Sequence, residues 1–144
     1  MKKTILATLA VLALTTPVLA DAACDHLSQE AADLDSRARV AEGQNRSVYT
    51  LMMQAVKDKD TVSAYRYAAR YKETTTIYLG LILEGQTLYD HMLADGLVTR
   101  CDLDLAYIKK EYARNLDLQQ EYTTRITDLT KALRAENAPD DTSY

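Results

Sequence analysis

Three long stretches of this sequence place apolar residues at alternating spacings of four and three, the heptad pattern of helices that pack side by side. The pattern predicts helices over residues 25–57, 61–94 and 102–136. The middle stretch also has apolar side chains outside its seam, so that helix should be buried on more than one face. The seams comprise Leu27, Ala31, Leu34, Ala38, Ala41, Asn45, Val48, Met52 and Ala55, then Ala64, Ala68, Tyr71, Thr75, Tyr78, Ile82, Gly85, Tyr89 and Met92, and finally Leu105, Ile108, Tyr112, Asn115, Gln119, Tyr122, Ile126, Leu129 and Leu133.

Short breaks separate these stretches. The first is a charged run that ends at Asp60, a residue suited to capping the next helix. The second begins at Asp95-Gly96, a helix-ending signal, and continues through residues 97–100 as an expected loop. Only four Gly and two Pro occur in 144 residues, too few for the many turns of a β-sandwich or barrel. Because short connections make neighbouring helices antiparallel, we expect an all-α fold, an elongated up-down-up three-helix bundle closed by one disulfide.

The two cysteines agree with that topology. Cys24 precedes the first predicted helix and Cys101 the third, so both should lie at the same end of an up-down-up bundle. An even number of cysteines in an exported chain favours a disulfide, with two free thiols as the alternative. The bridge would close a 78-residue loop.

Residues 1–20 have the features of a secretory signal peptide: Lys2-Lys3, a short apolar run, Pro17 and a small residue at Ala20. The apolar run is too short to span a membrane, and Asp21 argues against a lipid anchor on Cys24. We therefore expect a removed signal peptide at 1–20, a helical domain at 21–136 and a flexible acidic tail at 137–144. The expected location is the periplasm or the extracellular space.

The net charge and the absence of known catalytic motifs exclude several classes of function. Without Lys2 and Lys3 the chain has 15 basic and 21 acidic residues, a formal net charge of −6, and it has no basic cluster. Nucleic acids and anionic membranes are therefore not expected partners. The sequence has no Walker pattern, no G-x-S-x-G and no C-x-x-C-H, so we expect neither an enzyme nor a bound cofactor.

Four tyrosines of the middle stretch share one side of their helix: Tyr67, Tyr71, Tyr78 and Tyr89. All ten aromatic residues of the chain are Tyr, whose ring is apolar and whose hydroxyl is polar. Such a stripe suits a partner-binding surface, which is the hypothesis we take forward. The alternative is core packing, with Tyr in place of Phe.

Polar residues interrupt the apolar seams at similar heights along the predicted bundle. Asn45, Thr75, Asn115 and Gln119 should form a buried polar layer near its middle. A layer of this kind usually fixes the register of the helices, and the alternative is a ligand site in the bundle core.

Both histidines, His26 and His91, should lie at the disulfide end beside several carboxylates. Imidazole and carboxylate groups bind zinc or copper, which makes these two residues weak candidates for a metal site. The alternatives are solvated charges at helix ends and a pH-sensing pair.

Taken together, these features favour an exported, non-enzymatic helical binding protein that engages a specific protein partner in the cell envelope, as inhibitor or immunity proteins and secretion-system adaptors do. One alternative is a periplasmic chaperone that binds clients loosely, and another is a metal carrier using the two histidines. A homodimer is a further expectation, because the middle helix has apolar residues on several sides.

Overall fold

The computed structural model describes residues 22–136, so the predicted signal peptide and acidic tail lie outside the described residues. This part of the chain is helical. It comprises α1 (Ala22–Lys57), α2 (Thr61–Ala94), α3 (Leu97–Arg100) and α4 (Leu105–Glu136). The three long helices match the predicted ones to within three residues at each end. No helix in residues 22–136 is long and apolar enough to cross a membrane.

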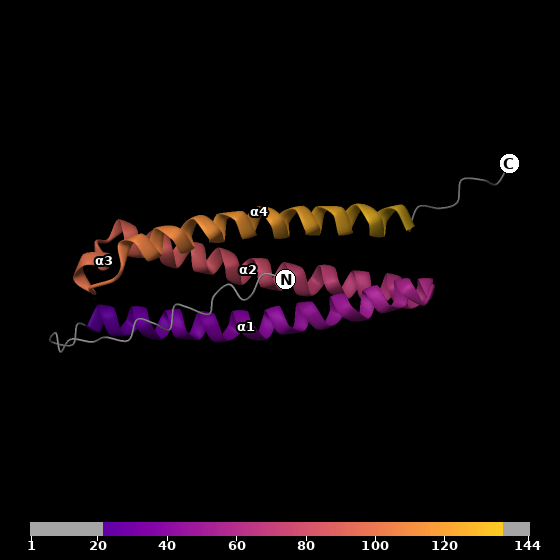
Figure 1. The fold of residues 1–144 in the computed structure, drawn as a ribbon, viewed down its shortest axis with the longest axis horizontal. Coiled ribbons are helices and arrows are strands. Elements are labelled where there is room, and N and C mark those ends of the chain that lie inside the picture. Colours follow the sequence, from indigo (N-terminus) through magenta and orange to yellow (C-terminus); the bar gives the residue numbers. More distant parts are fainter. Residues whose placement is uncertain (1–21, 137–144) are drawn as a thin grey trace.

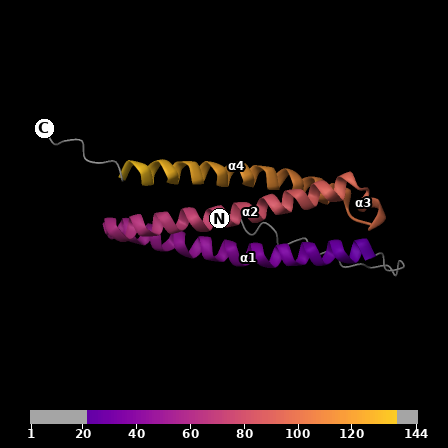
Figure 2. The ribbon, with the colours of Figure 1, turned by 180° about the vertical axis from the view of Figure 1, so that it is seen from behind.

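Helix α2 is the central element. It lies between α1 and α4, with which it runs antiparallel, and it packs against both (Figures 1 and 2). The backbones of α1 and α4 approach one another far less closely than either approaches α2. In Figure 1, α1 and α2 converge at their connecting turn, whereas α4 diverges from α2 toward its own C-terminal end.

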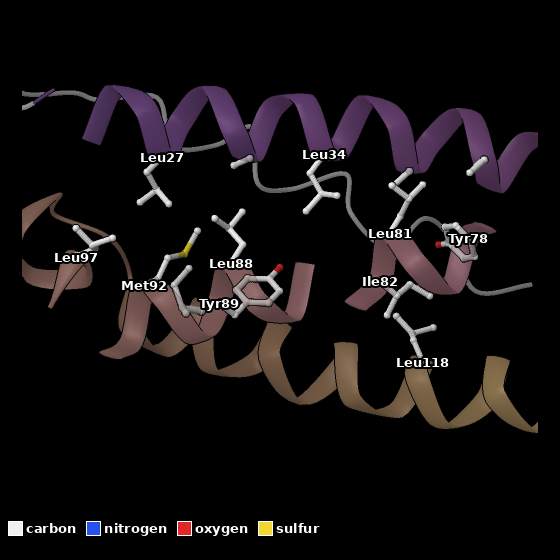
Figure 3. Close-up of a cluster of buried hydrophobic side chains, with 14 of the residues drawn as sticks. Leu27, Leu34, Tyr78, Leu81, Ile82, Leu88, Tyr89, Met92, Leu97 and Leu118 are labelled. Atoms are coloured by element: carbon white, nitrogen blue, oxygen red, sulfur yellow. The ribbon is translucent and has the colours of Figure 1, made fainter. Parts of the chain in front are cut away.

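The predicted seams supply most of the core, with the exception of Leu105 of α4, which is exposed. Every seam residue of α1 is buried except Met52, which is half-buried. Figure 3 shows Leu27 and Leu34 of α1 directed toward α2, and Leu118 of α4 close to Ile82. The buried seam thins toward the α1–α2 turn, where the last seam residues of α4 and the first of α2 are half-buried.

The α1–α2 turn has a tight geometry. Lys59 adopts a left-handed backbone with φ 58°, and its N–H donates to the carbonyl of Val56 at 3.1 Å. The N–H of Asp60 donates to the carbonyl of Ala55 at 3.0 Å, which completes a Schellman-type helix end. Asp60 then begins α2 as predicted, since its side chain accepts from the N–H of Ser63 at 3.0 Å.

The connection between α2 and α4 differs from the prediction. Residues 97–100, expected as a loop, form the single helical turn α3 because Leu97 turns into the core after the left-handed Gly96. Asp102 does not begin the last helix, because it too has a left-handed backbone, with φ 52°. Asp104 takes that role by accepting from the N–H of Tyr107 at 3.0 Å.

The predicted disulfide is present. Cys24 near the start of α1 bonds Cys101 directly after α3, with 5.6 Å between the two Cα atoms. The bond therefore ties the start of α1 to the connection between α2 and α4, at the end of the bundle opposite the α1–α2 turn.

Candidate functional site

The tyrosine stripe of α2 lies mainly in the core. Tyr71, Tyr78 and Tyr89 are buried, and Tyr78 is only 1% exposed. Tyr67 is half-buried. In this conformation a partner therefore has no access to three of the four side chains predicted to form its binding surface.

The buried tyrosines fill the space between α1 and α4. The ring of Tyr78 meets that of Tyr122 on α4 edge to face, with 5.0 Å between centroids. The ring of Tyr71 lies 5.3 Å from that of Tyr49 on α1, and its hydroxyl accepts from Arg125 on α4 at 3.1 Å. Tyr71 thus contacts both outer helices, and Tyr78 packs against α4.

Burial also changes the chemistry of these hydroxyls. It raises the pKa of Tyr78 and of Tyr89 above the ordinary value for a phenol, because the charged phenolate loses its hydration inside the protein. The nearby Glu111 carboxylate raises the pKa of Tyr89 further. The neutral form of each tyrosine is therefore favoured in the folded state.

The polar residues of the seams form two separate clusters rather than one layer. Asn45 of α1 donates to the hydroxyl of Thr75 on α2 at 2.7 Å and lies 3.0 Å from that of Thr74. Asn115 of α4 donates to the carbonyl of Ile82 at 3.0 Å. Each cluster thus links one outer helix to α2, as expected of groups that fix register.

Gln86 joins the second cluster, although its position outside the seam gave no signal in the sequence. Its side-chain oxygen accepts from Asn115 and from Gln119, both at 3.2 Å. Gln86 and Gln119 are half-buried, whereas two polar residues outside the seams, Asp35 and Glu111, are buried. Among buried side-chain atoms of residues 22–136, Oδ1 of Asp35 and Nε2 of Gln86 have no hydrogen-bond partner.

Each histidine lies beside a carboxylate four residues further along the chain. His91 Nδ1 lies 2.6 Å from Asp95, and His26 Nδ1 lies 3.8 Å from Glu30. All four side chains are more than half exposed. The described part of the chain contains no group of three or more His, Cys, Asp or Glu residues arranged to hold a metal ion.

An open pocket of about 450 Å³ lies at the α1–α2 turn, facing the C-terminal end of α4. Its lining is mainly apolar and comes from all three long helices and the turn. We call it the hairpin-end pocket, and it is lined by Met52, Ala55, Val56, Lys59, Asp60, Thr61, Ala64, Tyr65, Ala68, Ala132, Leu133 and Glu136.

The sequence explains why the pocket forms at this end. Along α2 the seam runs from Tyr89 through Tyr78 to Tyr71, and then its last two positions are Ala68 and Ala64. The tyrosines fill the space between α2 and its neighbours, but alanine is too short to do so. The small residues Ala55 and Ala132 on the facing helices leave it open as well.

Exposed apolar side chains continue from the pocket along α1. Tyr49, Met53 and Val56 recur at i, i+4 and i+7, so they share one side of the helix, and they are 43%, 45% and 56% exposed. Val56 also lines the pocket. A pocket joined to an exposed apolar stripe is a common form of protein-binding surface.

Two charged residues of the turn lie on the pocket lining. Asp60 is engaged as the cap of α2, and the hydrogen bonds from Ser63 lower its pKa. Lys59 contributes a cationic side chain from its left-handed position. With Glu136 of α4 also on the lining, the pocket can enclose an apolar group beside one ammonium group and two carboxylates.

Comparison with models of known protein families, with curated proteins and with solved structures gives no match for this chain.

Proposed function

We propose that the protein is an exported, non-enzymatic helical binding protein that engages a protein partner in the cell envelope through the hairpin-end pocket. The observation that supports this function best is the pocket itself, apolar, open and continuous with exposed apolar residues of α1. Its volume lies in the range of sites that accept a specific ligand group. A partner could bury this surface by inserting an apolar side chain.

The fold that we propose for the exported chain is an elongated up-down-up bundle of three long helices, located in the periplasm or outside the cell. The Cys24–Cys101 disulfide is compatible with such an oxidising compartment. Because the disulfide ties down the far end, a partner that enters the hairpin-end pocket would meet the less tightly packed end of the bundle.

The experiment compares capture of envelope proteins by the oxidised wild-type protein and by two variants. Ala68→Leu places a larger side chain in the pocket, whereas Ala69→Leu makes the same change at the neighbouring exposed position of α2. We expect one stoichiometric partner with the wild type and with Ala69→Leu, and its loss with Ala68→Leu. Equal capture by both variants would show that the pocket is not the binding site.

A chaperone that binds many clients loosely is the second candidate. The observation that favours it is the pair Met52 and Met53 at and beside the pocket, because flexible methionines suit surfaces that accept varied partners. Such a protein should suppress aggregation of unrelated unfolded proteins at stoichiometric ratios. No suppression by the wild type would exclude this function.

A further inference from the structure

We propose that the hairpin-end pocket receives an acidic amphipathic helix of the partner, which packs between α1 and α4 as a fourth helix. This inference rests on the proposed function and specifies the chemistry of the partner. It follows from three features of the structure: the shape of the site, the distribution of charge along the bundle, and the backbone of Lys59.

The shape suits a helix. The two walls of the site belong to α1 and α4, which are helices themselves, and the lining includes Ala64 and Ala68 of α2. Small side chains allow helix axes to approach closely, at separations near 8–10 Å. A helix in this position would present an apolar stripe to Val56 on one wall and Leu133 on the other, the mode of binding in which an amphipathic helix enters a groove.

The charge distribution sets the sign of the partner. Residues 46–73 and 121–136, which form the half of the bundle around the pocket, contain nine Lys or Arg and six Asp or Glu, a formal charge of +3. The remaining described residues contain six basic and twelve acidic residues, a formal charge of −6. The lining itself has one ammonium group, from Lys59, and two carboxylates, from Asp60 and Glu136. The excess of basic residues that favours acidic flanks on a partner helix therefore belongs to the half of the bundle around the pocket.

Lys59 adds an independent observation. A left-handed backbone favours glycine, and a side chain at that position has a cost in stability. The chain has lysine there, and the lysine lines the pocket. Residues held in unfavourable backbone conformations often occur at functional sites. A role in binding would account for lysine at this position, because an ammonium group on the pocket lining can pair with a carboxylate of the incoming helix.

The test uses two synthetic 18-residue helices with the same leucine stripe, one with glutamates and one with lysines on its flanks. Binding of each labelled peptide to the full, oxidised protein is measured by fluorescence anisotropy at low salt. We expect the glutamate peptide to bind at least tenfold more tightly than the lysine peptide. Its binding should weaken as salt is added. The net charge of the whole protein predicts the opposite preference.

Variants locate the interaction. Ala68→Leu should weaken binding of the glutamate peptide at least tenfold, and Ala69→Leu should leave that binding unchanged. Lys59→Gly should weaken binding of the glutamate peptide by about two- to fivefold, which is the contribution of one exposed ion pair. The same change should raise the melting temperature, because glycine relieves the left-handed backbone. Lys57→Gln removes a neighbouring charge outside the pocket and should have a smaller effect on binding.

Equal or tighter binding of the lysine peptide, or binding that is insensitive to Ala68→Leu, would overturn the inference. So would binding of dodecanoate micelles with no binding of either peptide, which would indicate a lipid ligand. If capture from the envelope finds a partner that depends on Ala68 but the glutamate peptide does not bind, the inference fails and the proposed function stands. If neither the capture experiment nor the peptide assay shows binding, the inference and the proposed function both fail.

Discussion

Replacing Tyr78 by alanine should greatly reduce the stability of the bundle. The side chain is 1% exposed and stacks edge to face on Tyr122. Truncating a buried aromatic side chain to alanine costs about 3–5 kcal/mol, through lost burial and the cavity left behind. Small domains have total stabilities of about 5–15 kcal/mol, so this single change removes a large part of the total.

The assay is thermal unfolding of oxidised protein, followed by circular dichroism at 222 nm. At about 4 °C per kcal/mol for a chain of this size, Tyr78→Ala should lower the melting temperature by about 12–20 °C. Tyr67→Ala, at the half-buried position of the same stripe, should have a much smaller effect. If Tyr78→Ala melts like the wild type but no longer captures a partner, the tyrosine stripe is a binding surface and the assignment to the core is wrong.

Three further changes test the account of stability. Replacing Cys24 and Cys101 by serine should lower the free energy of unfolding, measured by urea titration, by up to about 4.5 kcal/mol, because the unfolded chain gains the entropy that the closed loop lacks. Equal stability with and without the bond would contradict this. Asn115→Ala should cost about 0.5–1.5 kcal/mol in the same titration, because it removes the hydrogen bond to the carbonyl of Ile82, which keeps its bond within α2. Stability should also fall as the pH rises above about 10. The raised pKa values of Tyr78 and Tyr89 keep both protonated in the folded state after the unfolded chain has lost those protons. Tyr78→Phe should make this decline shallower, and an unchanged decline would refute the assignment to this hydroxyl.

The helices and the disulfide could be predicted from the sequence because each depends on local pattern. The heptad spacing identifies the buried side of α1 from Leu27 to Ala55, and the interruption by Asp60 identifies where α2 begins. The cysteines could be paired because the short connections determine which helix ends are adjacent. These predictions need only the period of the helix and the lengths of the turns.

The role of the tyrosines could not be predicted in the same way. The spacing of Tyr71, Tyr78 and Tyr89 shows that they share a side of α2, but a buried seam and an exposed binding stripe have the same period. Only the positions of α1 and α4 show that this side is covered. The Asn45 and Asn115 clusters also required the structure, because the sequence places both near the middle of the bundle without indicating which neighbour each one contacts.

The pocket was not predicted, although a signal was present in the sequence. The change along the α2 seam from tyrosine to Ala68 and Ala64 marks the position where a gap forms. Recognising it requires knowing that the tyrosines fill the space beside α2, which depends on packing between distant parts of the chain. The left-handed backbone at Lys59 had no signal, because glycine is the residue expected at such a position.

Site-specific photo-crosslinking tests the central claim, that the protein binds its partner through the hairpin-end pocket. A photoreactive amino acid is placed at Val56, on the pocket lining, and separately at Leu116, which is similarly exposed on α4 but does not line the pocket. Irradiation of the producing cells should yield one discrete adduct from position 56 and none from position 116. A discrete adduct from position 116 alone would contradict the claim.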